Sequence, residues 1–289
     1  MIVMHTPDGF ITSWICVLML IVSGAVVSLA LWNLRKNISR EKAIRIASFA
    51  ALIFAAQMIN FPIASGTSGH LIGAALAFLI FGADAAVIII ACVLLVQSFV
   101  FGDGGALALG ANVFNMAIIG VYSARVVYEK TKSIVATSWF SVVAASTACA
   151  IELGLSGTVP IVSALVAMVS VHAVIGIGEG LITLVAYNIF ANRTRFASLN
   201  FATATVGTSI FIVAILTPFA SQNPDGLDSV AINLGFFEKA TQIYNAPVPE
   251  YAIQLVGIGA YLSTVIAGII GILGTFFLVR AGTAFVMEK

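Results

Sequence analysis

Charged residues are scarce in this chain. Only 9% of the 289 residues are Asp, Glu, Lys or Arg, whereas a soluble globular domain carries roughly 25%. Because 61% of the residues are hydrophobic, too few charges remain to cover a surface that faces water. The formal net charge of +1 also argues against nucleic acid as a partner. We therefore expect lipid to surround most of the chain.

The motifs of several enzyme classes are missing as well. No Gly-Lys dipeptide occurs, so the chain has no G-x-x-x-x-G-K-[ST] loop with which to hold ATP. The H-E-x-x-H pattern is absent too, which argues against a membrane-embedded metalloprotease. Cys16, Cys92 and Cys149 stand singly in apolar stretches, and this spacing predicts neither a disulfide nor a cysteine metal cluster. The sequence therefore predicts no enzyme, no catalytic residue and no bound cofactor.

Long apolar stretches dominate what is present. A helix that spans a bilayer needs about 20 residues, and the stretch 70–82 is short enough that we expect it to be tilted or closely joined to the next helix. Strands are not expected, because the apolar runs are continuous and do not alternate as in a membrane barrel. The predicted fold class is an all-α integral membrane protein with about nine transmembrane helices. The stretches fall at residues 11–33, 43–60, 70–82, 84–101, 110–127, 134–154, 160–190, 199–217 and 251–279.

The distribution of basic residues predicts the orientation. Loops on the cytoplasmic side of membrane proteins are enriched in Lys and Arg. With the N-terminus outside, Lys239 is the only one of the 13 basic residues that falls on the outer side. The opposite orientation would reverse this distribution. We therefore predict that the N-terminus lies outside and the C-terminus inside.

A shift in composition near residues 191–199 predicts two units. The first, residues 1–195, holds seven apolar stretches and all three histidines. The second, residues 196–289, holds two apolar stretches around a polar loop at 218–250. This loop contains Asn-Pro-Asp-Gly, whose residue types favour a turn. We expect it on the outer side, where it would help open or close a path for the substrate.

The histidines suggest a metal site. No Lys or Arg precedes the first apolar run, so we expect no cleaved signal peptide. If the chain starts at Met4, its amine, the next amide nitrogen and Nδ1 of His5 can form two fused chelate rings, and His70 can complete a square of nitrogens. This arrangement suits Ni(II) and Cu(II), and a distorted one suits Co(II). The alternative is that His5 is a solvated terminal residue and His70 a hydrogen-bonding loop residue.

Other polar and small residues have two readings each. Asp103 and Asn112 lie in or next to an outer loop, where they can orient the histidines or fix the loop. His172 and Glu179 are seven residues apart on one helix face, and we favour structural hydrogen bonds for both over contact with substrate. A four-residue spacing of alanines lets another helix approach closely, for internal packing or for docking a partner subunit. The alanines are Ala43, Ala47, Ala51 and Ala55.

Several motifs resemble one family. The segment Met4-His5-Thr6-Pro7-Asp8-Gly9 is similar to the M-H-I-P-D-G start of the NikM/CbiM proteins. Residues 57–70, 101–116 and 172–183 resemble that family too, so the likeness covers about residues 4–190. The remainder resembles the NikN/CbiN accessory component, fused at the C-terminus as in NikMN proteins. Members of this family are the substrate-binding (S) components of energy-coupling-factor (ECF) transporters, which import nickel or cobalt.

The resemblance implies a site, partners and a location. The metal ligands carry over as the Met4 amine, the His5 amide and imidazole, and His70. Because Met1-Ile2-Val3 precede the family's start, we predict that the working N-terminus is Met4. A transmembrane coupling (T) subunit and ATP-binding-cassette ATPases would supply the energy, in the inner (cytoplasmic) membrane of a prokaryote. Nickel and cobalt both remain open as the substrate.

Two other transport functions are alternatives. A secondary transporter driven by an ion gradient is often built from inverted halves with broken helices, and the sequence shows no such halves. An S-component for a vitamin would lack the Met-His start. Because the 218–250 loop contains no histidine, we expect removal of residues 199–289 to reduce uptake more than equilibrium metal affinity.

Overall fold

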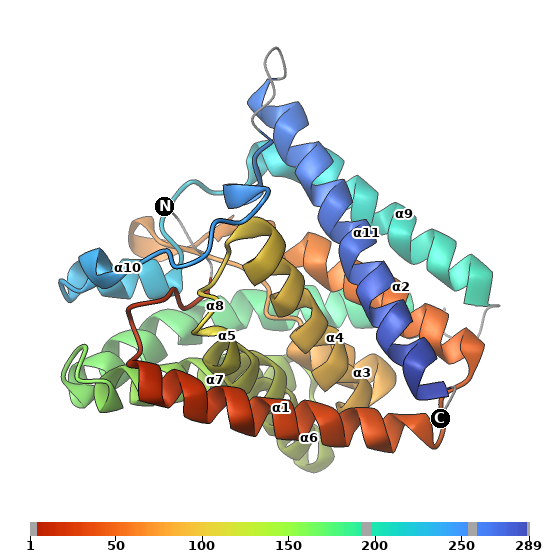
Figure 1. The fold of residues 1–289 in the computed structure, drawn as a ribbon, viewed down its shortest axis with the longest axis horizontal. Helices are drawn as coiled ribbons and strands as arrows, with labels where there is room; N and C mark the ends of the chain where they lie inside the picture. The colour runs from red at the N-terminus through yellow and green to blue at the C-terminus, as the bar shows by residue number, and fades with distance from the viewer. Residues whose placement is uncertain (1–4, 192–197, 254–258, 288–289) are drawn as a thin grey trace.

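The chain folds as a bundle of helices in the computed structural model, which describes residues 5–191, 198–253 and 259–287 (Figure 1). Strands occur only as one two-residue antiparallel ladder among these residues. The helices are α1 Ser13–Arg35, α2 Arg40–Gln57, α3 Ala74–Phe81, α4 Ala83–Val96, α5 Leu109–Asn112, α6 Gly120–Thr131, α7 Ile134–Leu155, α8 Ile161–Phe190, α9 Ser198–Leu216, α10 Gly226–Asn233 and α11 Ala260–Met287. The strands are β1 Phe61–Pro62 and β2 Ser68–Gly69. Short turns of 3-10 helix lie at Ala64–Gly66, Thr217–Phe219, Phe237–Lys239 and Pro249–Tyr251, and π-helical turns at Gln97–Phe101 and Val113–Ile119.

The prediction of an all-α membrane protein is confirmed. Among the described residues, six helical stretches are long and apolar enough to cross a bilayer. Each of the nine predicted apolar stretches contains a helix. The helix in the short stretch, α3, has only 8 residues and is followed directly by α4 after Gly82. The six candidate spans are 13–35, 83–101, 134–155, 161–190, 200–219 and 260–285.

Helix α2 is the centre of the larger core. Its residues Phe49, Ile53 and Phe54 are fully buried, and α9, α11 and α4 pack around it. Figure 1 shows α9 and α11 running beside α2. Gly271 of α11 lies directly against the ring of Phe54, where a Cβ would not fit. The last two long helices of the chain are therefore integral to the core and not an appendage.

The alanine stripe of α2 serves internal packing. Ala43, Ala47, Ala51 and Ala55 are all 0% exposed, because α9 and α11 cover this helix. Small side chains let neighbouring backbones approach closely and gain van der Waals contact in a membrane. The alternative, a docking face for a partner subunit, is excluded because the protein's own helices cover the stripe.

Four loops are joined at one end of the bundle. Ser68 N–H donates to the carbonyl of Pro224, and Thr241 N–H donates to the carbonyl of Asp8. Similar backbone bonds join Ser221 to Asn60 and Val248 to Val100. The β1–β2 ladder belongs to this region and is the one exception to the predicted absence of strands. Irregular backbone is tolerated in a membrane protein where protein groups satisfy its polar atoms, as they do here.

Candidate metal site

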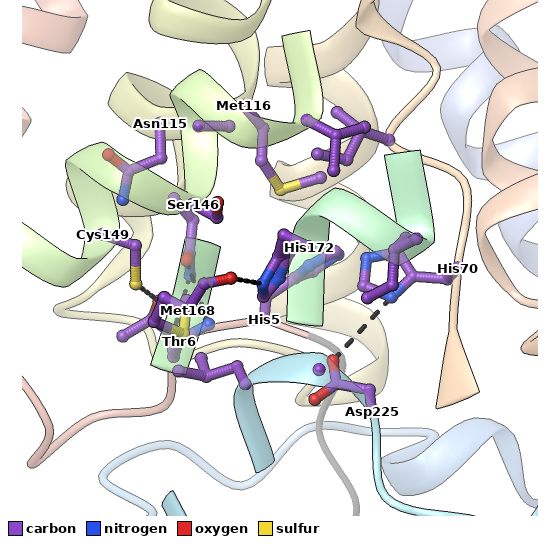
Figure 2. Close-up of a pocket in the computed structure, with 17 residues that line it drawn as sticks. His5, Thr6, His70, Asn115, Met116, Ser146, Cys149, Met168, His172 and Asp225 are labelled. Carbon is purple, nitrogen blue, oxygen red and sulfur yellow. Dashed lines mark hydrogen bonds and ion pairs between the residues drawn. The ribbon is translucent and has the colours of Figure 1, made fainter. Parts of the chain in front are cut away.

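All three histidines line one cavity, although 167 residues separate the first from the last. The cavity has a volume of about 70 Å³ and lies where the four loops meet the bundle (Figure 2). Its lining includes the polar side chains of Asn112, Asn115 and Asp225. It also includes the sulfur-containing side chains of Met116, Cys149 and Met168. The sequence thus places its few histidines where the chain encloses space.

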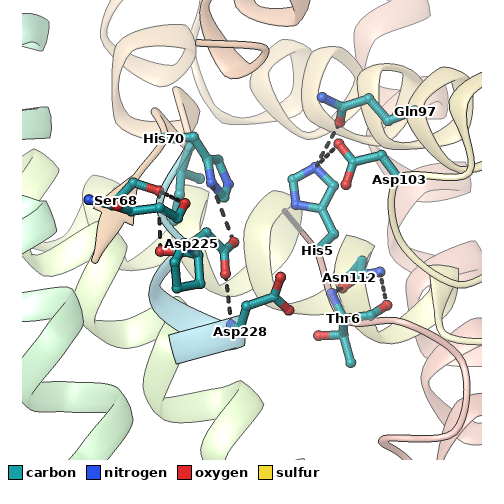
Figure 3. Close-up of polar contacts among 12 residues, drawn as sticks. His5, Thr6, Ser68, His70, Gln97, Asp103, Asn112, Asp225 and Asp228 are labelled. Atoms are coloured by element: carbon teal, nitrogen blue, oxygen red, sulfur yellow. Dashed lines mark hydrogen bonds and ion pairs between the residues drawn. The ribbon is translucent and has the colours of Figure 1, made fainter. Parts of the chain in front are cut away.

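His5 is buried and not solvated. Its residue is 3% exposed, and its ring points toward Gln97 and Asp103 (Figure 3). Nε2–H donates to Oε1 of Gln97 at 2.9 Å, and Oδ2 of Asp103 lies 4.0 Å from the same nitrogen. Because a hydrogen bond on one ring nitrogen fixes the tautomer of a neutral imidazole, the lone pair of this tautomer is on Nδ1 of His5. This is the nitrogen that a chelate with the preceding amide would use.

The segment after His5 is anchored by the backbone of residues 106–108 and by the side chain of Asn112. Asn112 makes two hydrogen bonds to the backbone of Thr6, accepting from N–H at 3.1 Å and donating to the carbonyl at 3.0 Å. The Asp8 carboxylate accepts from the backbone N–H groups of three successive residues, Ala106 to Ala108, at 2.9–3.1 Å. A side chain on Gly105 would collide with Asp8. Asn112 therefore fixes the residue next to His5, as one of its two predicted roles requires.

His70 approaches His5 from the opposite side of the cavity. The two ring centroids are 5.2 Å apart, with 74° between the ring planes. Nδ1 of His70 is buried without a hydrogen-bond partner within the described residues. Burial, with the nearby His5 and His172, lowers the pKa of His70 well below its usual range. The ring is therefore neutral at pH 7 and can offer a lone pair to a cation.

Residues 198–253 contribute to this cavity, which the sequence did not predict. Oδ2 of Asp225 lies 3.8 Å from Nδ1 of His70, and its Oδ1 accepts from Asp228 N–H at the start of α10. Burial and the nearby Asp228 raise the pKa of Asp225 well above its usual range. On the other side, the Tyr251 hydroxyl donates to Oδ2 of Asp103 at 2.6 Å. Residues 198–253 therefore supply the acidic group beside His70, and they also bind the acidic group beside His5.

Three further residues were singled out from the sequence: His172, Glu179 and Met4. His172 lines the cavity, and its Nδ1–H donates to the Met168 carbonyl at 2.8 Å, as the structural reading predicted. Glu179 is fully buried, and its carboxylate accepts hydrogen bonds from the N–H groups of Ile72 and Gly73, just before α3. Met4 lies outside the described residues.

The side chains of the described residues do not make a complete metal site by themselves. Within residues 5–191, 198–253 and 259–287, no three His, Cys, Asp or Glu side chains are grouped closely enough to hold a metal ion. His5 and His70 supply two imidazoles, so further donors would have to come from backbone or terminal nitrogen atoms.

Comparisons with known proteins agree with the resemblance seen in the sequence. A family model for CbiM, described as a cobalt uptake substrate-specific transmembrane region, matches residues 5–197, and one for the PDGLE domain matches residues 199–288. A putative fused nickel transport protein NikMN of Archaeoglobus fulgidus is 35% identical over 93% of this chain and 94% of its own. Cobalt transport protein CbiM 1 of Pelobacter propionicus is 28% identical over 68% of this chain and 96% of its own. A crystal structure of a transition metal transporter, 32% identical, superposes with a TM-score of 0.58 over 67% of this chain and all of that chain.

Proposed function

The chain belongs to the CbiM family, and we propose that it is the substrate-binding component of an ECF-type ABC importer for Ni(II) or Co(II). The observation that carries this proposal is the pair of imidazoles of His5 and His70, whose side chains are 1% and 11% exposed and whose ring centroids are 5.2 Å apart across one cavity. Nε2 of His5 is bound to Gln97, which leaves Nδ1 as the nitrogen that can face a metal. Metal–nitrogen bonds measure about 2.0–2.1 Å for imidazole ligands, so a single ion fits between the two rings after a small adjustment.

The proposed ligands are the Met4 amine, the His5 amide and Nδ1, and one nitrogen of His70. Four nitrogens of this kind favour the square-planar geometry of Ni(II) and, with distortion, serve Co(II). Asp103 and Asn112 do not bind the metal in this proposal but hold the ligand His5 in position. Asp103 lies beside Nε2 of His5, and Asn112 holds the backbone of Thr6. Outer partners of this kind fix the orientation of a ligating histidine.

The size of the cavity argues against a vitamin as substrate. A buried water occupies about 10–15 Å³ by this measure, so a cavity of about 70 Å³ has room for only a few such groups. An ion and its ligands fit, whereas a vitamin does not. The relatives carry both nickel and cobalt in their names, so the choice between these metals is left to experiment.

We propose two units, 1–195 and 196–289, with about nine spans, the N-terminus outside and the C-terminus in the cytoplasm. The metal enters the cavity from the outer side, and a coupling (T) subunit with ATPases in the prokaryotic inner membrane drives its release inside. Labelling tests this orientation. Residue 238 is exposed in the outer loop and residue 130 in the basic loop. Glu238→Cys should react with an impermeant thiol reagent in intact cells, and Lys130→Cys should not; the reverse pattern would overturn the orientation.

Metal analysis tests the function itself. Protein purified from cells grown with nickel, and separately with cobalt, should carry about one ion per chain for the preferred metal. His70→Ala should lose that ion while keeping its helical content by circular dichroism. Wild-type protein that carries neither metal under both conditions would contradict the proposal.

A further inference from the structure

A carboxylate in the middle of the bundle holds the backbone that follows His70. Glu179 lies on α8 and is 0% exposed. Its Oε2 accepts from the N–H of Ile72 at 2.8 Å, and its Oε1 accepts from the N–H of Gly73 at 2.9 Å. These residues follow His70 by only two and three positions, at the start of α3. Both oxygens of the carboxylate are therefore used on one short stretch of chain.

The same stretch is held from the other side. Nε2 of Gln57, on α2, donates to the carbonyl of Ile72 at 2.7 Å. Gly73 has a φ of 74°, which other residues adopt at a cost, and a side chain there would collide with Ile53. The backbone of Ile72 and Gly73 is thus held by three hydrogen bonds to two helices that are distant in sequence.

On its N-terminal side, His70 follows a second fixed point. It comes directly after β2, whose Ser68 donates its N–H and its hydroxyl to backbone carbonyls of the second unit (Figure 3). His70 is therefore suspended between the ladder and the peptide held by Glu179. The ring itself makes no hydrogen bond through Nδ1 within the described residues, so its place depends on the backbone at either end.

The carboxylate of Glu179 is buried at the N-terminus of an eight-residue helix. Removing a charge from water carries a desolvation penalty, which hydrogen bonds offset only when their geometry is good. The two N–H groups and the positive end of the helix dipole of α3 compensate here. A buried carboxylate of this kind is expected where a backbone position must be accurate, because the ligand atoms of a binding site must lie within about 0.5 Å of the productive geometry.

We propose that Glu179 is a positioning residue that sets the place of His70 for the metal. This inference rests on the proposed function, in which His70 is the one donor that does not come from the terminal chelate. Without Glu179, the peptide after His70 loses two bonds and the ring can leave the plane of the other donors. The terminal donors are unaffected, because Asn112 and Asp8 hold them independently.

The test uses Cu(II) as a spectroscopic probe of the full chain beginning at Met4. The terminal amine, amide and imidazole can hold Cu(II) without His70, so binding stays measurable when the fourth nitrogen is lost. Replacing that nitrogen by water moves the visible absorption band of the bound ion to longer wavelength. Glu179→Gln keeps the size of the side chain but leaves one oxygen acceptor and places an NH₂ group against an N–H donor.

The matched control is Glu152→Gln. Glu152 is the other buried carboxylate within the spans of the described chain, is 4% exposed and accepts a hydrogen bond from Asn115 at 2.7 Å. Its side chain binds Asn115 and not the backbone after His70 in the described part of the chain, so its substitution should change helix packing and not the position of that ring. Helical content by circular dichroism must be kept in each variant that is compared.

Three results decide the proposal. Glu179→Gln should shift the Cu(II) band toward that of His70→Ala and weaken Ni(II) binding 10–100-fold, as for outer-shell partners of metal ligands. Glu152→Gln should leave the band in place, and the double variant with His70→Ala should match His70→Ala alone. A wild-type band position for Glu179→Gln would overturn the role of Glu179. So would a double variant in which the band shifts of the two single variants add. A wild-type band for His70→Ala would instead overturn His70 as a ligand.

Discussion

His5 and His70 face each other across one cavity, yet the chain holds them in different ways. His5 belongs to a terminal segment in which Gln97 binds the ring, Asn112 binds the backbone and backbone N–H groups of residues 106–108 bind Asp8. His70 belongs to the connection between β2 and α3, and bonds on both sides of it fix its backbone. The terminal segment is held by contacts with the loops that surround it. The backbone after His70, in contrast, is bound to the core helix α8 through Glu179. The proposed site therefore joins one donor set delivered by a chain end with one donor built into the fold.

The comparison predicts the largest losses for the two ligand histidines themselves. His5→Ala and His70→Ala, in the chain beginning at Met4, should each weaken Ni(II) binding by more than about 100-fold, beyond the 10–100-fold typical of outer-shell partners. Each removes one of the proposed nitrogen ligands. Equilibrium binding to purified protein measures the effect. Retention of wild-type affinity by either variant would mean that its ring is not a ligand.

The position of the amine gives the next largest effect. Each added residue extends the chain by up to about 3.3–3.6 Å, so three residues before Met4 can carry the amine roughly 10 Å away. A chain beginning at Met1 should therefore bind Ni(II) far more weakly than one beginning at Met4, while His70 stays in place. Mass spectrometry of both proteins must confirm the start before affinities are compared. Equal affinities would remove the amine from the proposed ligand set.

Asp8 tests the anchoring of the terminal segment. Its carboxylate accepts three backbone N–H groups, and Asp8→Asn leaves one oxygen and adds a donor that faces them. We expect Ni(II) affinity to fall about 10–100-fold, in the range for lost outer partners, without loss of helical content. Asp84→Asn is the control, since Asp84 accepts a hydrogen bond from Asn33 near the end of α1, away from the terminal segment. Equal effects of the two variants would indicate a general loss of stability.

Part of this arrangement was predictable from the sequence and part was not. The nine apolar stretches predicted helices, because continuous hydrophobicity is a local property. His5 and His70 followed from a short motif with known chelate chemistry. Gln97 and Tyr251 did not, because each acts through contacts with residues far away in the sequence. For Glu179 the sequence predicted structural hydrogen bonds but not their partners. The sequence placed Asp8 in a motif but showed no partner for it, since those partners are backbone N–H groups.

The second unit carries a further lesson of this kind. Its loop has no histidine, which favoured a role in transport over one in binding. The structure places Asp225 against His70 and covers α2 with α9 and α11. Removing residues 199–289 would expose the buried face of α2, so this deletion cannot separate binding from folding. A single substitution in the loop is the sharper test.

Asp225→Asn provides that substitution. Asn caps a helix about as well as Asp does, so α10 should keep its first turn while the carboxylate beside His70 is lost. We expect Ni(II) affinity to fall about tenfold, or ~1.4 kcal/mol, and the loss should be absent when His70 is already Ala. Isothermal titration of the single and double variants measures this coupling. An unchanged affinity in Asp225→Asn would show that the loop covers the cavity without supporting the ligand.

His172 should show the smallest effect, although it lines the same cavity. Its ring sits on α8, where Nδ1–H is committed to the Met168 carbonyl one turn earlier at 2.8 Å. No carboxylate among the described residues pairs with it, in contrast to His5 and His70. His172→Ala should therefore weaken Ni(II) binding less than about tenfold, or ~1.4 kcal/mol, measured under the same conditions as His70→Ala. The pair is a matched comparison, because both variants remove an imidazole from one cavity. A loss in His172→Ala as large as that in His70→Ala would mean that the fold supplies two fixed imidazoles, and the terminal chelate would then provide fewer of the ligands.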